Sequence, residues 1–103
     1  EASTCLSVDS NGAGWGFRNT CGYNVQFAYC MQNASDKSAA CGSGTGSGDV
    51  RPNGFALVLD NREIVTAEEE FRWVACAGSA DQVAAHLDRP DPPAGRCVPV
   101  RTL

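Results

Sequence analysis

The chain has 103 residues, six cysteines and a formal net charge of −4 at pH 7. A chain of this length forms one domain with a modest hydrophobic core, which covalent crosslinks help to stabilise. It contains no run of basic residues and no apolar stretch of about 18 residues, so the sequence predicts neither a nucleic-acid partner nor insertion into a membrane.

Short strands are predicted for the N-terminal third of the chain. The first alternates around Leu6 and Val8, which is the period-two pattern of a half-buried strand. The polar, Gly-rich residues 10–14 predict a tight turn after it, and a second turn follows at 21–24. The predicted meander has strands at residues 4–9, 15–21 and 25–31.

The middle of the chain is more polar. Gly and Ser dominate residues 42–48, so composition predicts a flexible loop there. The sequence Pro52-Asn53-Gly54 is a strong turn signal. Apolar segments after it predict further strands at residues 55–59, 64–67 and 70–77.

The C-terminal part contains the only predicted helical turn, at residues 81–87. The Pro-rich residues 88–93 cannot continue a helix, because proline lacks a backbone N–H donor. Residues 97–100 are predicted as a closing edge strand, where Pro99 is tolerated. The sequence therefore predicts one all-β domain over residues 1–103, a small antiparallel sandwich or barrel of about six to eight strands.

The cysteines indicate a disulfide framework, because an even number is spread along a small chain. Their spacing lacks the close pairs of a structural zinc site. Disulfides persist in oxidising compartments, so the predicted location is extracytoplasmic, either periplasmic or secreted. The expected connectivity is the sequential one, with three bridges that each close a short loop: Cys5–Cys21, Cys30–Cys41 and Cys76–Cys97.

Six aromatic residues form pairs that are two positions apart, and residues so spaced share a face of a strand. The pairs are Trp15 with Phe17, Phe27 with Tyr29, and Phe71 with Trp73. Three interpretations remain open: a buried aromatic core, an exposed platform that stacks on sugars, or a division in which Trp15 or Tyr23 is exposed near a turn. The candidate ligand-binding residues are Trp15, Arg18, Tyr23, Arg72 and Trp73.

No residue pattern in the chain predicts catalysis. His86 is the single histidine, and no GxSxG motif marks a nucleophile for it. The adjacent carboxylates at 68–70 point to alternate faces of a strand, so they cannot flank a glycosidic bond. The turn at 9–14 begins like a calcium loop, but Ala13 and Thr20 stand where ligands belong. We therefore expect no catalytic residues, no metal site and no cofactor.

Residues 15–21, 25–30 and 71–76 together resemble small, largely uncharacterised Cys-rich domains of exported bacterial proteins, often found at the end of a longer chain. The resemblance rests on Cys and aromatic spacing and implies no active site. Glu1 as first residue fits a mature exported protein or a domain of a longer chain.

These observations predict a non-catalytic extracytoplasmic binding or accessory module. Its partner would be a protein or a glycan, or the rest of a longer chain. The alternatives are a small secreted hydrolase inhibitor that presents a disulfide-braced loop, a carbohydrate-binding module with an aromatic platform, and an enzyme built around His86.

Overall fold

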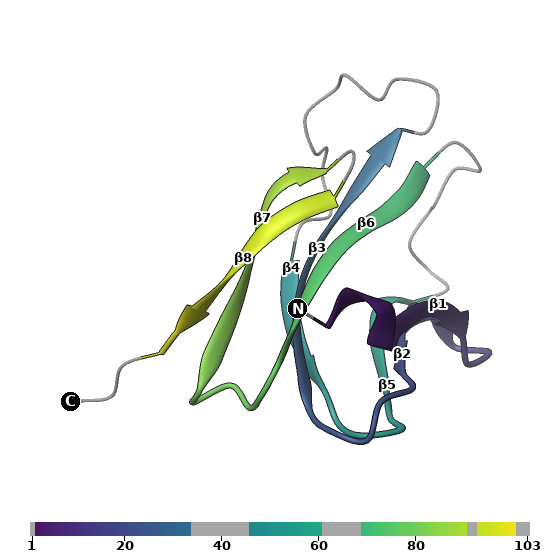
Figure 1. Cartoon of the computed structure of the whole chain (residues 1–103). Coiled ribbons are helices and arrows are strands. Elements are labelled where there is room, and N and C mark those ends of the chain that lie inside the picture. Colours follow the sequence, from purple (N-terminus) through teal and green to yellow (C-terminus); the bar gives the residue numbers. More distant parts are fainter. Residues whose placement is uncertain (1, 34–45, 61–68, 91–92, 101–103) are drawn as a thin grey trace.

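The computed structural model describes residues 2–33, 46–60, 69–90 and 93–100, and within these ranges the fold is all-β (Figure 1). A single 3-10 turn, η1 (Ser3–Cys5), precedes the first strand. The strands are β1 (Leu6–Ser10), β2 (Gly14–Asn19), β3 (Val25–Asn33), β4 (Gly46–Val50), β5 (Phe55–Asp60), β6 (Glu69–Ala77), β7 (Val83–Pro90) and β8 (Pro93–Pro99). None of the described segments is a helix of the length and apolarity that crossing a membrane requires.

The strands form three antiparallel sheets, as expected for an all-β chain with short connections. The first sheet has the order β1-β2-β5, the second has the order β4-β3-β6, and β7 and β8 form a separate hairpin. The second sheet lies between the other two layers, because its inner face meets the first sheet and its outer face meets the hairpin (Figure 1).

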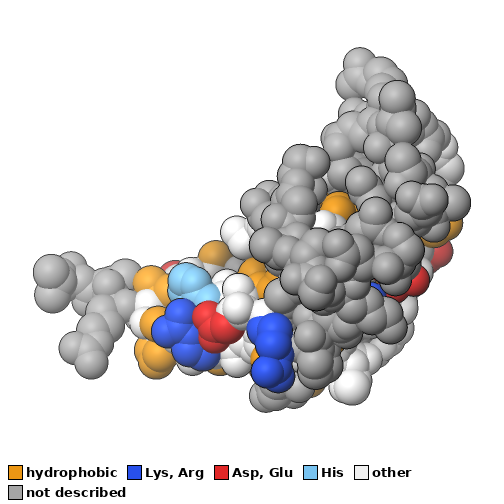
Figure 2. Space-filling model, turned by 90° about the horizontal axis from the view of Figure 1, so that it is seen from above, with side chains coloured by type: hydrophobic (Ala, Val, Ile, Leu, Met, Phe, Trp, Pro, Cys, Tyr) orange, Lys and Arg blue, Asp and Glu red, His pale blue; other side chains and the backbone are white. Residues whose placement is uncertain are grey.

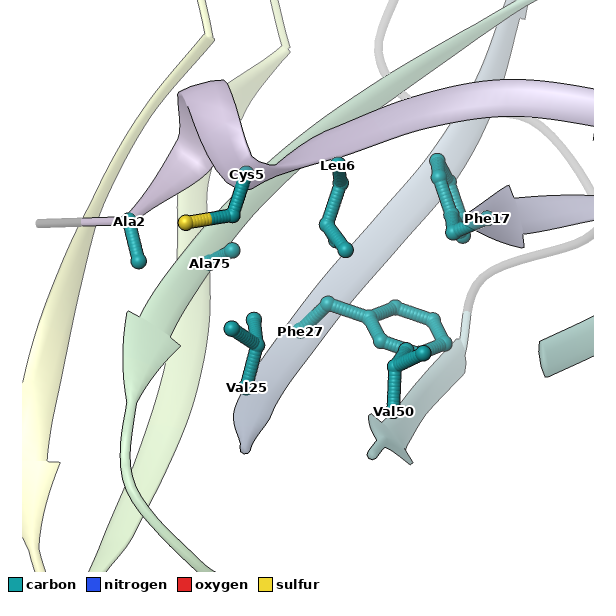
Figure 3. Close-up of a cluster of buried hydrophobic side chains, with 8 residues drawn as sticks. All are labelled: Ala2, Cys5, Leu6, Phe17, Val25, Phe27, Val50 and Ala75. Atoms are coloured by element: carbon teal, nitrogen blue, oxygen red, sulfur yellow. The ribbon is translucent and has the colours of Figure 1, made fainter. Parts of the chain in front are cut away.

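The main core lies between the first two sheets and includes side chains from both (Figure 3). Phe17 of β2 is fully buried at its centre. The Phe17 ring lies 4.9 Å from that of Phe27, 5.3 Å from that of Phe71 and 5.2 Å from that of Trp73, centroid to centroid. Tilted ring pairs at such distances add to the stabilisation that area burial provides.

A buried amide joins two turns at one end of this core. Asn19, the last residue of β2, has no solvent exposure. Its Nδ2 donates to the carbonyls of Tyr23 at 2.8 Å, Val50 at 3.2 Å and Arg51 at 3.2 Å, and its Oδ1 accepts the N–H of Cys21 at 2.9 Å. The Asn19 side chain therefore provides hydrogen bonds to backbone groups of both turns, as buried polar groups require.

The N-terminal residues cover the outer edge of β6. The N–H of Ala2 donates to the carbonyl of Ala75 at 3.0 Å, and the N–H of Ala75 donates to the Ser3 hydroxyl at 3.1 Å. The indole N–H of Trp73 donates to the Ser3 carbonyl at 3.2 Å. The backbone N–H and C=O of Ala75, which face the outer edge of β6, are thus paired within the chain.

The prediction of a flexible loop at 42–48 is wrong for its last three residues, which belong to β4. The register pairs Gly48 with Phe27 and Gly46 with Tyr29 across β3 and β4. A Cβ placed on Gly48 would lie 2.7 Å from the Phe27 ring, and one on Gly46 would lie 2.8 Å from the Tyr29 ring. The glycines leave space for the rings, so composition that is typical of a loop here serves close packing.

We expect Gly48→Ala to lower the free energy of unfolding by about 1–3 kcal/mol, because the Phe27 ring is packed against Phe17 and cannot move freely. The matched control is Gly22→Ala, where an added Cβ meets nothing within 4 Å. Urea unfolding of both variants measures the difference. Equal stability of the two variants would contradict the packing of Phe27 on Gly48.

The helical turn predicted at 81–87 is also wrong, because residues 83–87 lie in β7. Val83, Ala85 and Leu87 are half-buried, and from Ala85 onward they alternate with the exposed polar residues His86 and Asp88. That alternation has the period of a strand, and pairing with β8 outweighs the helix propensity of the two alanines. The turn predicted at Pro52-Asn53-Gly54 is confirmed, with Asn53 at a φ of 58°.

Two predicted disulfides are confirmed. Cys5–Cys21 joins the ends of the β1–β2 hairpin, and Cys76–Cys97 joins β6 to β8. Cys30 is buried and disulfide-bonded, but its expected partner Cys41 lies outside the described residues, so that pairing stays a prediction. The strand predicted at 64–67 also lies outside them.

Candidate functional site

Two of the predicted ligand-binding residues are exposed aromatics at opposite ends of β2. Trp15, near the start of the strand, is 47% exposed, and Tyr23, in the turn that follows the strand, is 46% exposed. The Tyr23 hydroxyl contacts the Cys5 sulfur at 3.1 Å. A register shift at Trp15 and Gly16 separates the exposed Trp15 from the buried Phe17. The two exposed rings therefore do not form one surface.

Arg18 lies on the first sheet and takes part in two contacts. Its Nε donates to Asp9 Oδ2 at 2.7 Å, and its guanidinium lies over the Phe55 ring at 5.3 Å from the centroid. The hydrogen bond from Arg18, with a second one from the Ser10 N–H, holds the pKa of the Asp9 carboxyl below its ordinary value. A lowered carboxyl pKa stabilises the fold at neutral pH, and that contribution is lost as the pH falls through the folded-state pKa.

Arg72 and Trp73 are neighbours on β6 and point to opposite faces of the second sheet. Trp73 belongs to the core cluster, and Arg72 Nη2 lies 3.0 Å from Glu70 Oε2. The five predicted ligand-binding residues are therefore spread over both main sheets, and the structure does not bring them together at one site.

A different site lies on the other side of the molecule, between the second sheet and the β7–β8 hairpin. A groove of about 720 Å³ runs there along β3, β4 and β7, and we call it the hairpin groove. Its volume is within the range of ligand-binding pockets, about 300–1,000 Å³. Its lining residues include Ala28, Ser47, Asp49, Val83, Ala85 and Leu87.

The hairpin groove exists because the hairpin covers only part of the sheet beneath it. The hairpin has two strands, with β8 on β6 and β7 on β6 and β3, while the sheet has three. The outer face of β4, which carries Ser47, is left without a strand above it among the described residues. The Cys76–Cys97 disulfide holds the hairpin at this position.

Small apolar side chains form part of the walls of the hairpin groove, together with the polar side chains of Gln26, Ser47 and Asp49. Ala28 of β3 is almost fully buried at its floor, whereas Val83, Ala85 and Leu87 of β7 are only half-buried. The pairing of Ala85 with Cys97, whose sulfur is bonded to Cys76, shows that this set of β7 side chains faces the second sheet. Apolar side chains at the interface of two layers thus retain access to solvent.

The outer edge of β7 carries hydrogen-bonding groups directed at the hairpin groove. The Val100 N–H donates to the Gln82 carbonyl at 3.1 Å, so this cross-strand pair is hydrogen-bonded. Bonded and non-bonded pairs alternate in an antiparallel ladder, so Ala85 and Leu87 direct their N–H and C=O groups away from β8. No other described strand pairs with β7.

One carboxylate lies at the Val83 end of the hairpin groove. Asp49 is exposed, and its Oδ1 accepts hydrogen bonds from Asn24 Nδ2 and Gln26 Nε2. The Gln26 amide also donates to the Gly78 carbonyl at 3.1 Å, which ties this end of the groove to the start of the hairpin. Asp49 is the only acidic residue among the described groove-lining residues.

The His86 side chain lies on the face of the hairpin opposite that of Ala85 and Leu87, although the residue also borders the hairpin groove. It pairs with Arg96 across the hairpin, and Arg96 makes two hydrogen bonds with Asp88, at 2.9 and 3.2 Å. The pale blue histidine side chain lies beside charged side chains on the hairpin (Figure 2). Within the described ranges, no group of three or more His, Cys, Asp or Glu side chains is placed to hold a metal ion.

Sequence reasoning missed the hairpin groove because it assigned both of its walls to the wrong structure. Residues 46–48 were expected in a loop, and 81–87 in a helical turn. The alternation of Val83, Ala85 and Leu87 with Ala84, His86 and Asp88 was the available signal for a strand. Comparison of the chain with protein-family models, curated proteins and solved structures gave no match.

Proposed function

We propose that this chain is a non-catalytic, extracytoplasmic binding or accessory module that holds its ligand in the hairpin groove. The observation that supports this function is that no described strand of the hairpin layer lies over β4, where half-buried apolar side chains border a groove of about 720 Å³. Concave apolar sites with a few polar groups are where proteins most often bind ligands.

The disulfides support the extracytoplasmic part of the proposal. Two bridges link elements that are 16 and 21 residues apart in sequence. Each would stabilise a chain of this size by about 3 kcal/mol through loop closure, and such bonds persist outside reducing compartments. The Cys76–Cys97 bridge also makes the hairpin groove a preformed feature, which reduces the ordering cost of binding.

The alternative functions receive less support. An aromatic platform for sugars would need exposed rings, but five of the six paired aromatics lie in or against the core. An inhibitory loop at 42–48 would lose residues 46–48, which are held in β4 against Phe27 and Tyr29. A site around His86 would have an arginine as its nearest cross-strand neighbour.

The oxidised protein can be screened against a phage-displayed peptide library and a glycan array. We expect binders whose affinity falls at least tenfold in Ser47→Arg, because Ser47 is an exposed groove residue and the longer side chain fills the space above β4. Trp15→Ala changes an exposed residue of the first sheet and is the matched control. Thermal unfolding confirms that both variants are folded.

Two results would contradict the proposal. Recovery of no binder from either library would remove the binding function. Binders that lose affinity with Trp15→Ala and not with Ser47→Arg would move the site to the first sheet and favour the aromatic interpretation.

A further inference from the structure

We propose that the hairpin groove accepts an extended peptide segment of a partner protein, which adds as a third strand to the edge of β7 that no described strand pairs with. This inference rests on the proposed binding function and specifies the ligand class. The segment would complete the outer layer, so that three strands cover the three strands of the second sheet.

The backbone of β7 supports an extended ligand over a compact one. Ala85 and Leu87 direct N–H and C=O groups into the hairpin groove at the spacing of a strand. The Val83 N–H already donates to the Ser79 carbonyl at 3.1 Å, so the edge open to a ligand runs from the Val83 carbonyl to Leu87. It is about 13 Å long, since a strand rises about 3.3 Å per residue, so it matches about five residues of an added strand. Main-chain hydrogen bonds of this kind provide affinity in β-strand addition, and side-chain pockets provide specificity.

The floor of the hairpin groove defines which side chains the segment carries. Ala28 and Ser47 are small, and Gly48 beside them contributes only backbone to this face. Side chains of the size of valine or larger would therefore fit where they point inward from the added strand, and they would cover Val83 and Leu87. Burial of these apolar groups stabilises the complex by about 25 cal/mol per Å² of apolar surface removed from water.

The width of the hairpin groove argues for a single strand. The strand β7 packs on β3 and β6, and β4 is the next and last strand of the second sheet, so one added strand beside β7 would cover it. Asp49 at one end of the hairpin groove favours a positive charge on the ligand, and the chain as a whole carries a net charge of −4. The occupant is therefore an extended segment with alternating small apolar residues and a Lys or Arg at the Asp49 end.

The probe is a nine-residue peptide of alternating Val and Thr with Lys at one terminus, made with the Lys at either end. We expect one orientation to bind the oxidised protein, and replacement of its Lys by Glu to weaken binding about fivefold. Asp49→Asn should abolish the difference between the Lys and Glu peptides. Isothermal titration calorimetry measures both effects.

Strand addition has a signature that other binding modes lack. N-methylation of the peptide at the positions that face β7 should reduce affinity at least tenfold, whereas N-methylation at the intervening positions should have little effect. The amide protons of Ala85 and Leu87 should exchange more slowly in the complex. Ser47→Arg, which fills the hairpin groove, should prevent binding.

The outcomes separate the two proposals. One result would overturn strand addition and leave the binding function in place. In that result, other ligands bind in the hairpin groove and lose affinity with Ser47→Arg, whereas the peptides do not bind or bind equally well wherever they are N-methylated. The protein alone could also dimerise through this edge. Dimers that ultracentrifugation detects in the absence of peptide, and that Ser47→Arg removes, would assign the edge to a second copy of the chain and overturn the proposal.

Discussion

Replacement of Asn19 by alanine is expected to lower the free energy of unfolding by about 3 kcal/mol. The Asn19 amide donates to the carbonyls of Tyr23, Val50 and Arg51 and accepts from the Cys21 N–H, in a place without solvent. Alanine would leave these groups without a partner, and each buried polar group that loses its hydrogen bond costs about 1–3 kcal/mol. Water that enters the space left by the side chain would recover part of that cost.

The matched control is Asn11→Ala, at an exposed position in the β1–β2 turn. The Asn11 Oδ1 accepts the Ala13 N–H at 2.9 Å, and its loss should cost less than about 1 kcal/mol because water replaces it. Asn19→Asp separates hydrogen bonding from packing, since a carboxylate of the same shape cannot donate to carbonyls. Chemical unfolding in urea should rank the wild type, Asn11→Ala and Asn19→Ala in that order of decreasing stability, with Asn19→Asp at least as unstable as Asn19→Ala. Equal midpoints for the two alanine variants would contradict the role of Asn19.

Phe17→Ala is expected to lower the free energy of unfolding by about 4 kcal/mol. The Phe17 ring is fully buried and lies within 6 Å of the centroids of Phe27, Tyr29, Phe71 and Trp73. Its removal leaves a cavity that several large rings cannot all fill, and such changes cost about 3–5 kcal/mol. Phe17→Leu keeps most of the volume and should cost less.

Trp15→Ala, two residues away on the same strand, provides the contrast. Trp15 is 47% exposed, so we expect a loss of less than about 1 kcal/mol. The two variants together distinguish a core ring from a surface ring by calorimetry or urea unfolding. A loss of stability in Trp15→Ala as large as in Phe17→Ala would contradict this placement of the rings.

The sequence was sufficient to predict the parts of the fold that depend on local alternation. The strands around Leu6, Phe27 and Trp73 lie where period-two patterns and turn residues place them. The sequential pairing also predicted Cys5–Cys21, which closes the β1–β2 hairpin, and Cys76–Cys97, which joins β6 to β8 in the next layer.

The parts that failed depend on contacts between distant residues. Nothing local distinguishes a Gly-Ser linker from β4, whose glycines are required by Phe27 and Tyr29 on another strand. Likewise, Ala84 and Ala85 favour a helix by propensity, and only pairing with β8 and the bond from Cys97 to Cys76 make this segment a strand. Because these two segments form the walls of the hairpin groove, the candidate site could not be located from the sequence.

The hydrogen bonds that Ala2 and Ser3 make along β6 have a consequence for solubility at high concentration. An unpaired outer edge on β6 would be a template on which neighbouring molecules could stack their own strands. The contacts of Ala2 and Ser3 with the backbone of Ala75 interrupt that template in the middle of the edge, and the Trp73 indole bond holds Ser3 in place. Their benefit would therefore extend to collisions between folded molecules, where they oppose edge-to-edge pairing on β6.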